Sequence, residues 1–239
     1  MNSTYSYKIF SCGDSAVTVD FGNVIDEDIN VYVLQLFHHL TQKNIDGVKD
    51  VIPAYSSITV VYDVFAIHAM EKCTTAYNFM QQTLQGILCE ELINMPTTGR
   101  LIKIPACYRE AFAPDIIEIA ALRNLSVDEL INLHCSKTYR VYMLGFLPGF
   151  AYMGIVDEKV ATPRKNTPRT KVPAGSIGIA GSQTGIYPFE SPGGWNIIAQ
   201  TPLTLFDAGT PRPALLQAGD TVQFYPVTIT EFNNIKAAQ

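Results

Sequence analysis

Glycine and proline are concentrated in one stretch of this 239-residue chain, and that concentration limits what the chain can fold into. The chain has 16 Gly and 14 Pro, and nineteen of these lie between residues 145 and 213. Within residues 166–206 the only charged side chains are Arg169, Lys171 and Glu190. Apolar and aromatic residues nevertheless recur in this part of the chain, namely Val172, Ile177, Ile179, Tyr187, Phe189, Trp195, Ile197 and Ile198. Disordered segments lack such side chains, so the stretch predicts a packed, turn-rich β structure.

The C-terminal part of the chain has the pattern of a β domain. From Tyr139 to the end we predict strands and turns and no helix. The strand-like runs are 139–146, 194–200 and 220–225. Many short strands separated by Gly/Pro turns favour a barrel or a sandwich. Two short helices are predicted before them, at 115–122 and at about 127–135, and Ser126 with Glu129 forms a capping-box pattern at the start of the second.

The N-terminal part alternates between the periods of strands and helices. The expected elements are two strands within 7–20, a helix at 27–42, a hairpin of 48–53 and 57–62, a helix at 66–85 and a strand at 100–105. Strand, helix, strand, strand, helix, strand is the split βαβ order of a ferredoxin-like fold. We therefore predict an α+β protein with a ferredoxin-like α/β sandwich domain at 1–98 and a β-barrel domain at 99–239. The sequence leaves open to which domain the strand at 100–105 belongs.

Charge and composition exclude several classes of protein. The chain has 17 basic and 22 acidic residues and a net charge of −5, which is not the footprint of a nucleic-acid binder. No apolar run approaches the ~20 residues that span a bilayer, and the N-terminus lacks the apolar region of a signal peptide. We therefore expect a cytoplasmic protein with no membrane or nucleic-acid partner. Its five cysteines are widely spaced without a CxxC pair, which favours reduced thiols.

Familiar motifs of cofactor binding and hydrolysis are absent. The sequence contains no phosphate loop, no dinucleotide-binding glycine pattern, no His-Glu-x-x-His and no Gly-x-Ser-x-Gly. All four histidines precede residue 135, and His38 and His39 are adjacent on a predicted helix, so they do not share a face. His134 is interpreted as a residue that caps the end of its helix. We predict no metal site.

A basic loop and two glycine-containing turns are the candidate binding elements. Arg164, Lys165, Arg169 and Lys171 fall within eight positions of a proline-stiffened loop. The planar forks of Arg164 and Arg169 suit a carboxylate or a phosphate, and a solvated loop is an equal alternative.

The turns at 181–188 and 191–195 are the second candidate. Gln183, Thr184, Gly193 and Gly194 offer polar side chains and backbone amides, and Trp195 offers an aromatic wall. Simple hairpin turns are the alternative, and the sequence alone favours them. Glu190, the lone acid of residues 166–206, is a candidate acid or base, or else a surface turn residue.

The quoted residues resemble a known family. The matching segments are Cys107-Tyr108, Phe112–Asp115, Leu133-His134, Tyr139–Phe150, Ala161–Arg164, Val172–Gly181, Gln183–Pro188 and Ser191–Trp195. They are similar to the family of 5-oxoprolinase B subunits, also named KipI-type kinase inhibitor and allophanate hydrolase subunit 1. The resemblance is specific over residues 105–225 and looser before them. One departure is that Arg109-Glu110-Ala111 and Ala113 stand where the family usually has Gly-Gly-Glu and Gly.

The resemblance implies a cyclophilin-like barrel and an enzyme that works in a complex. Its implied partners are the C subunit of 5-oxoprolinase, which is a homologous barrel protein, and the A subunit. The implied reaction is the ATP-dependent opening of the 5-oxo-L-proline lactam to L-glutamate. ATP, with Mg²⁺ as its counter-ion, would bind at an atypical site shared with a partner protein, because the chain has no phosphate loop.

The resemblance also suggests roles for the candidate residues. Arg164 and Arg169 would bind the substrate carboxylate or phosphate. Thr184, Tyr187 and the Gly193-Gly194 amides, together with Gln183 and beside Trp195, would hold the activated oxygen. Glu190 and Tyr187 are the catalytic candidates. Two alternatives stay open, namely inhibition of a sporulation-type histidine kinase and a part in urea or allophanate breakdown.

Overall fold

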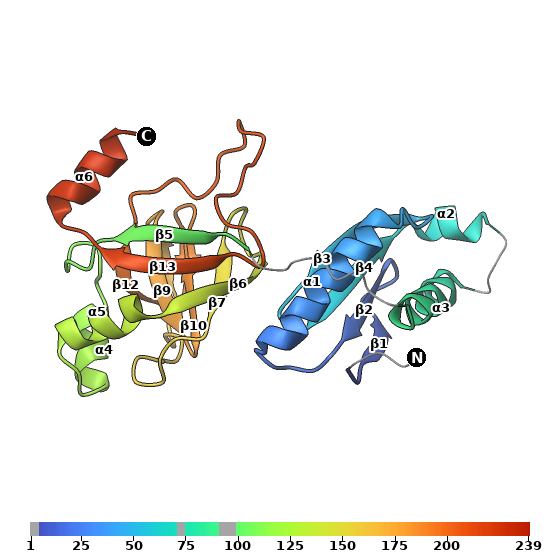
Figure 1. Cartoon of the computed structure of the whole chain (residues 1–239), viewed down its shortest axis with the longest axis horizontal. Helices are drawn as coiled ribbons and strands as arrows, with labels where there is room; N and C mark the ends of the chain where they lie inside the picture. Colours follow the sequence, from blue (N-terminus) through green and yellow to red (C-terminus); the bar gives the residue numbers. More distant parts are fainter. Residues whose placement is uncertain (1–4, 71–74, 91–98) are drawn as a thin grey trace. The chain divides into compact units, whose positions relative to one another are not determined.

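The computed structural model describes residues 5–70, 75–90 and 99–239 (Figure 1). The chain divides into two compact units, Met1–Thr97 and Thr98–Gln239, and each is described by itself. The domain boundary predicted at residues 98 and 99 falls at the edge of a segment, 91–98, that lies outside the described residues.

The first unit is a four-stranded antiparallel sheet with helices. Its strands are β1 (Lys8–Ser11), β2 (Ala16–Asp20), β3 (Val48–Pro53) and β4 (Ser57–Tyr62), in the order β1-β2-β4-β3. The helix α1 (Glu27–Gln42) begins where the Asp26 side chain accepts the Ile29 N–H. The predicted helix at 27–42 and hairpin at 48–62 are thereby confirmed. Val17, Val33, Ile58, Met80 and Leu84 are fully buried in the core of this unit.

One prediction for this part of the chain was wrong, and one question that the sequence left open is answered. The helix expected at 66–85 is two helices, α2 (Val64–His68) and α3 (Ala76–Leu88), and residues 71–74 between them lie outside the described residues. The reason is a second helix start, because the Thr75 side chain accepts the Asn78 N–H and caps α3. The strand expected at 100–105 belongs to the second unit, and β1 fills the fourth place in the first sheet. The ferredoxin-like order is therefore not confirmed.

The second unit is built on a nearly closed, barrel-like sheet. Its seven strands follow the order β12 (Asn196–Gln200), β9 (Ser176–Ala180), β10 (Gln183–Ile186), β7 (Ala151–Gly154), β6 (Thr138–Leu144), β13 (Thr221–Pro226) and β5 (Leu101–Ala106). Cys107, directly after β5, joins the far edge of the sheet. Its N–H donates to the Gln200 carbonyl at 2.8 Å, and the Gln200 N–H donates back at 3.1 Å. These two bonds bring the edge strands β5 and β12 together.

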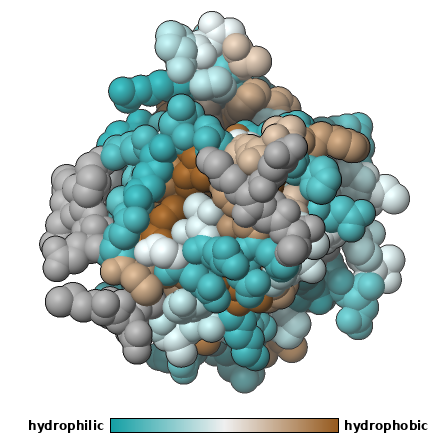
Figure 2. All heavy atoms as spheres, turned by 90° about the vertical axis from the view of Figure 1, so that its right-hand side faces the viewer, coloured by the Kyte–Doolittle hydropathy of each residue, from teal (hydrophilic) through white to brown (hydrophobic). Residues whose placement is uncertain are grey.

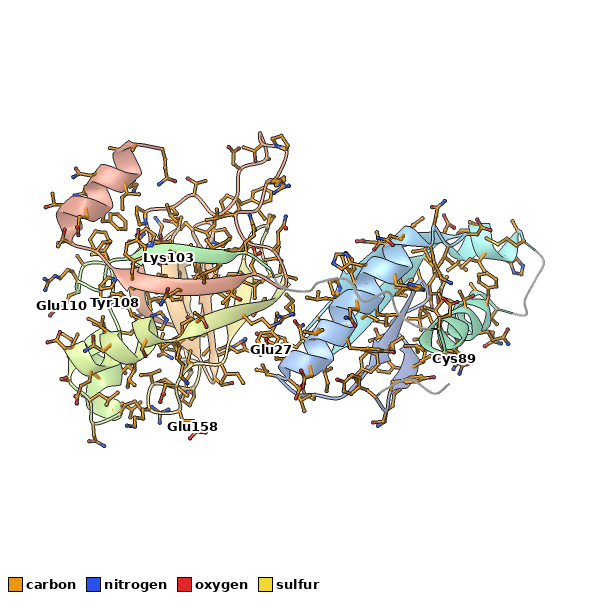
Figure 3. The ribbon with its side chains drawn as sticks, in the orientation of Figure 1. Glu27, Cys89, Lys103, Tyr108, Glu110 and Glu158 are labelled. Atoms are coloured by element: carbon orange, nitrogen blue, oxygen red, sulfur yellow. The ribbon has the colours of Figure 1, made fainter. Side chains whose placement is uncertain are left out.

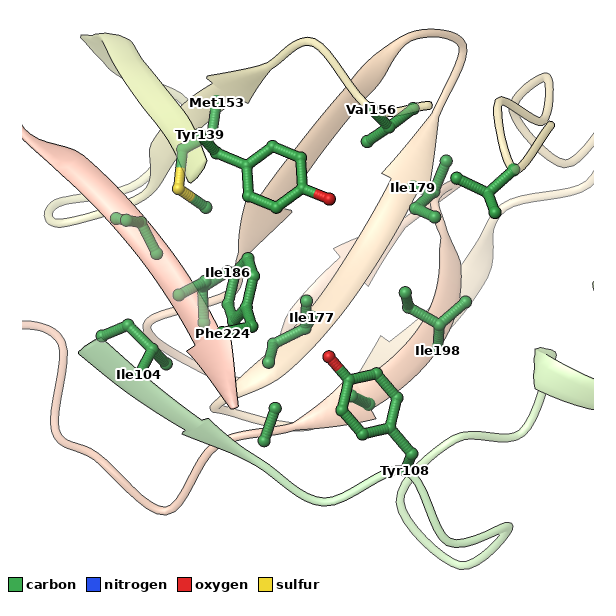
Figure 4. Packing of buried hydrophobic residues seen from close by; sticks show 14 of the residues in the cluster. Ile104, Tyr108, Tyr139, Met153, Val156, Ile177, Ile179, Ile186, Ile198 and Phe224 are labelled. Atoms are coloured by element: carbon green, nitrogen blue, oxygen red, sulfur yellow. The ribbon is translucent and has the colours of Figure 1, made fainter. Parts of the chain in front are cut away.

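The interior of this sheet is the main hydrophobic core. Ile104, Ile177, Ile198 and Phe224 converge there, and the hydroxyls of Tyr108 and Tyr139 point into the same space (Figure 4). A separate two-stranded ribbon pairs β8 (Arg169–Val172) with β11 (Ser191–Gly193).

Three helices accompany the barrel, namely α4 (Ile116–Leu122), α5 (Val127–Ser136) and α6 (Ile229–Ala237). The predicted capping box of Ser126 and Glu129 opens α5. Thr228 and Glu231 form a second capping box that opens α6. The prediction of no helix after Tyr139 was therefore wrong, although the Thr-x-x-Glu signal was legible in the sequence.

The surface is mixed in character. The face shown in Figure 2 is mostly hydrophilic, with hydrophobic residues visible in small areas. Among the described residues, no helix is both long and apolar enough to span a bilayer.

Candidate functional site

An aromatic cluster lies on the outer face of the barrel sheet. Phe150 packs edge-on against Tyr187 and Trp195, with ring centroids 5.2 and 5.6 Å apart. Successive residues of an extended chain point to opposite faces of a sheet. Ala151 and Ile198 accordingly belong to the barrel core, whereas Phe150 and Ile197, each one residue earlier, belong to this cluster. The sheet therefore separates the aromatic cluster from the barrel interior.

Two glycines of the sheet make room for these rings. Gly178 and Gly185 are directly opposite each other on β9 and β10. A Cβ on Gly178 would lie 3.0 Å from the Trp195 Cβ, and one on Gly185 would lie 3.0 Å from Phe150. The glycine content that marks this part of the sequence thus allows large rings to lie directly on the sheet.

Asp115 anchors the basic loop. It is almost fully buried, and it binds Arg169 through two hydrogen bonds of 2.8 and 2.6 Å and Lys165 through an ion pair of 2.9 Å. It also accepts the Ile197 N–H at 2.7 Å. Burial by itself would raise the pKa of Asp115, but these three donors outweigh burial and hold that pKa below its ordinary value. Arg169, a sequence candidate for ligand binding, is therefore already engaged.

Arg164 has different surroundings from its neighbours. It is exposed, and its guanidinium carbon lies 5.8 Å from the centre of the Trp195 ring, within cation–π distance. Lys171 pairs with Glu190 at 3.1 Å across an exposed surface. Among the described residues, Arg164 is the cation of the 164–171 loop that has no carboxylate partner.

Tyr187 is enclosed in the aromatic cluster. Only 1% of it is exposed, and its hydroxyl lies near the backbone N–H of Trp195. Burial, the largest effect, raises the pKa of Tyr187, so it is a neutral phenol near pH 7. A Cβ on Gly193 would overlap this hydroxyl, whereas Gly194 has no atom closer than 3.7 Å. The structure thus brings Tyr187, Gly193 and Trp195 together.

Thr184 and Gln183 occupy opposite faces of β10. Thr184 is fully buried on the barrel side, where its hydroxyl donates to the Gly178 carbonyl at 3.0 Å. Gln183 is half-buried and shares its face with Gly185 by strand alternation. The geometry therefore does not bring Thr184 together with the aromatic cluster.

Phe146 is a site feature that the sequence reasoning missed. Its backbone φ is +68°, a left-handed conformation that costs an aromatic residue free energy, and its side chain is 60% exposed. Its ring packs edge-on against Phe150 at 5.6 Å and Tyr187 at 6.4 Å. The legible signal was an aromatic residue inside a Gly-Phe-Leu-Pro-Gly turn. A strained backbone that exposes a large ring is typical of a functional position.

His134 is the second residue that the sequence reasoning misplaced. It is fully buried, stacks on Phe224 with ring centroids 4.6 Å apart, and joins its Nδ1 to the Tyr108 hydroxyl at 2.7 Å. Its Nε2 lies 3.4 Å from the Thr184 hydroxyl. Burial lowers the pKa of His134 to about 3, so the imidazole is neutral near pH 7. The interpretation as a helix cap was wrong, because the side chain lies inside the barrel.

The described residues hold no group of three or more His, Cys, Asp or Glu side chains arranged to bind a metal ion. Taken together, the residues described above form one candidate site, which consists of the aromatic cluster, the Gly193-Gly194 segment, Arg164 and the exposed ring of Phe146.

Comparison with known proteins assigns this barrel-like sheet, with aromatic rings on its outer face, to one protein family. The chain belongs to the family described as carboxyltransferase domain, subdomain C and D, whose model matches residues 7–216. It is 38% identical to the 5-oxoprolinase B subunit of Bacillus subtilis (strain 168) over 235 residues, which cover 98% of each chain. It is 35% identical to the 5-oxoprolinase B subunit of Escherichia coli O157:H7, over 92% of this chain and 95% of that one.

Solved structures show the same fold. TTHA0988 is 32% identical with a TM-score of 0.76, over 89% of this chain, which spans 40% of that protein. A conserved uncharacterized protein from Pyrococcus horikoshii is 42% identical with a TM-score of 0.55, over 94% of this chain and 100% of the other. Urea carboxylase of Kluyveromyces lactis shares the fold with a TM-score of 0.75 at 19% identity, over 97% of this chain and 22% of its own. Urea amidolyase of Saccharomyces cerevisiae is 24% identical over 90% of this chain and 13% of that protein.

Proposed function

We propose that this chain is the B subunit of an ATP-dependent 5-oxoprolinase, which opens the lactam of 5-oxo-L-proline to L-glutamate together with the A and C subunits. The observation that carries the proposal is the 38% identity to a 5-oxoprolinase B subunit over 98% of both chains. The weaker urea amidolyase likeness covers 13% of that much longer protein. The activity belongs to the assembled complex, in which this chain supplies part of the site.

Arg164 is our candidate for binding the substrate carboxylate. Lys165 and Arg169 are held by Asp115, and Lys171 pairs with Glu190, so Arg164 is the cation of this loop that is free to meet a ligand among the described residues. A guanidinium binds a carboxylate through two parallel hydrogen bonds. The guanidinium of Arg164 lies over the buried Trp195 ring, so a carboxylate bound to it would lie next to the aromatic cluster.

Tyr187 and the Gly193-Gly194 segment shape the rest of the site. The neutral Tyr187 hydroxyl lies near the backbone N–H of Trp195 and against Gly193, where an added Cβ would overlap it. Backbone amides can stabilise negative charge that develops on an oxygen. We assign that role to the Gly193-Gly194 segment, and we keep Glu190 as the candidate for proton transfer. Gln183 lies on the same face of the sheet as the aromatic cluster. Thr184 lies inside the barrel, where its hydroxyl contacts His134 and donates to the Gly178 carbonyl.

The described residues of this site do not fit ATP by themselves. A triphosphate with Mg²⁺ needs several free cations or backbone donors, yet Arg164 is the one loop cation without a carboxylate partner among the described residues. We therefore assign ATP binding to a site completed by a partner protein of the complex.

We also propose a fold type for each of the two units. The nearly closed sheet of the second unit is a cyclophilin-like barrel. In the first unit, β2, α1 and β3 form a split βαβ unit with β4 between its strands, and β1 takes the place of the closing strand. This is a permuted ferredoxin-like arrangement. We place the complex in the cytoplasm.

Reconstitution tests the function. The chain is co-expressed with the A and C subunits, and ATP hydrolysis is measured with and without 5-oxo-L-proline. We expect substrate-dependent hydrolysis in the complex, and an increase of KM for 5-oxo-L-proline of about 10- to 100-fold in Arg164→Gln, the loss of one charged hydrogen-bonded pair. Arg212→Gln, which removes an exposed charge outside this loop, is the control and keeps the KM.

Two other results would replace the proposal. Activity with urea or allophanate instead of 5-oxo-L-proline would make the chain a component of urea breakdown. Near-stoichiometric inhibition of a sensor histidine kinase by the purified chain, without substrate-dependent hydrolysis in the complex, would make it a kinase inhibitor. An unchanged KM in Arg164→Gln would remove only the assignment of Arg164.

A further inference from the structure

A cavity lies away from the aromatic cluster, at the end of the second unit where the Tyr108–Glu110 turn meets α5 and α6. Figure 3 labels Tyr108 and Glu110 at this end. Its volume is about 430 Å³, within the range of small-molecule sites. Its lining residues are Tyr108, Arg109, Val127, Asp128, Ile131, Pro226, Val227, Thr228 and Glu231. None of them belongs to the candidate site of the proposed function.

The floor of this cavity is apolar. Val127 and Ile131 come from α5, and Pro226 and Val227 lead from β13 into α6. Tyr108 adds an aromatic wall whose position is fixed, because its hydroxyl bonds to the buried His134 at 2.7 Å. A rigid apolar floor with a few polar groups at its edge is the usual make-up of a ligand site.

Three charged side chains lie at the edge of the cavity, and one of them already has hydrogen-bond partners. The Glu231 carboxylate accepts both the backbone N–H and the hydroxyl of Thr228, at 2.7 and 2.8 Å, so the capping box uses it. The guanidinium of Arg109 and the carboxylate of Asp128 have no hydrogen-bond or ion-pair partner among the described residues. They line the same cavity without pairing with each other, so a cationic and an anionic group face it separately.

We propose that this cavity binds the zwitterion of an α-amino acid with an apolar side chain. Arg109 would take the carboxylate through its planar fork, and Asp128 would take the ammonium group. The apolar floor formed by Val127, Ile131 and Val227 would hold the side chain. The two free protein charges sum to zero, as do those of the ligand. A simple anion or cation would leave one of them unmatched, and the apolar floor disfavours an acidic side chain such as that of glutamate.

Titration of the full chain with single amino acids tests the site. The probes are L-leucine, L-glutamate, and two analogues of leucine that each lack one charge, 4-methylpentanoate and 3-methylbutylamine. Binding is followed by amide NMR shifts and by calorimetry. We expect saturable binding of L-leucine, and affinities about tenfold weaker, or weaker still, for L-glutamate and for both analogues.

Variants assign the two charges. Arg109→Gln and Asp128→Asn should each weaken L-leucine binding about tenfold, with far-UV circular dichroism unchanged. Glu110→Gln and Arg212→Gln alter exposed charges that do not line the cavity, and they should bind as the original chain does. No saturable binding of L-leucine, equal binding of the one-charge analogues or of L-glutamate, or binding that survives both variants would overturn the proposal. These readouts need no partner protein, so they are independent of the oxoprolinase assay.

Discussion

Asp115 and Arg169 are 54 residues apart in the sequence, and the structure joins them by two parallel hydrogen bonds of 2.8 and 2.6 Å. Asp115 opens α4, and Arg169 opens β8 of the ribbon next to the aromatic cluster. The same carboxylate accepts the backbone N–H of Ile197 in β12. One buried side chain therefore fixes the helix, the basic loop and the strand that follows Trp195.

The first prediction concerns this anchor. Asp115→Asn removes the buried charge, leaves Arg169 without its carboxylate partner, and leaves Lys165 paired with the exposed Glu118 alone. Breaking a fully buried pair costs about 3–5 kcal/mol, and because the Arg169 side chain is 30% exposed we expect a loss of about 2–4 kcal/mol in the free energy of unfolding. Urea denaturation measures it. Glu190→Gln, which breaks the exposed pair with Lys171, is the control and should change stability by about 0.5 kcal/mol or less. Equal effects of the two variants would contradict the anchoring role.

The basic residues that Asp115 binds could be identified from the sequence, but Asp115 could not be identified as their partner. The cluster of Arg164, Lys165, Arg169 and Lys171 was legible as a binding element, since all four lie within eight positions. Which of them is free depends on Asp115, about fifty residues earlier, and such a long-range ion pair has no local signature. Regular elements were easier to predict, because caps and periodicity are local, as the Ser126–Glu129 box shows.

The sequence reasoning also did not identify which face of the sheet each strand residue occupies. Thr184 looked equivalent to its neighbours in a polar turn, yet strand alternation turns it into the barrel towards His134. The sequence reasoning treated the turns at 181–188 and 191–195 as one surface, whereas the sheet divides their residues between its two sides. The left-handed backbone of Phe146 was equally hidden, because that conformation is rare for an aromatic residue.

The second prediction is a pH dependence due to His134. Its pKa falls from 6.5 in the unfolded chain to about 3 in the folded one, because burial disfavours the charged ring. Between these values the unfolded state binds a proton that the folded state does not. The contribution to stability is therefore complete above pH 6.5 and is lost as the pH falls, by up to about 1.4 kcal/mol per pH unit. Asp115, whose pKa is also lowered, contributes only at lower pH.

Urea denaturation between pH 7 and 5 checks this prediction. The original chain should lose stability over that interval, and His134→Gln should be less stable at pH 7 but flatter with pH. A matching slope in the two proteins would show that His134 is protonated without cost in the folded state. His38→Gln, at a residue of α1 in the other unit, is the control and keeps the slope.

The third prediction separates two adjacent glycines. A Cβ on Gly193 would overlap the hydroxyl of Tyr187, which is packed on all sides, so Gly193→Ala should displace that ring and cost about 1–3 kcal/mol. Gly194→Ala adds the same methyl group where the nearest atom is 3.7 Å away, and we expect little loss. Thermal unfolding of the two variants measures the difference. In the reconstituted complex, the Gly193 variant should also lose activity, because it displaces Tyr187 from the aromatic cluster of the candidate site.

The fourth prediction concerns Phe146, whose left-handed backbone suits glycine better than an aromatic residue. Phe146→Gly removes the backbone strain, worth about 1–3 kcal/mol, and loses ring contacts that are partly exposed. We therefore expect stability to change by about 1 kcal/mol or less, because the two effects oppose each other. Because the exposed ring belongs to the candidate site, we expect the same variant to lose oxoprolinase activity despite its intact fold. Phe189→Ala, at another partly exposed aromatic residue outside the aromatic cluster, is the comparison. An active, fully assembled Phe146→Gly complex would assign the ring to packing alone, and the strain would then have no part in the reaction.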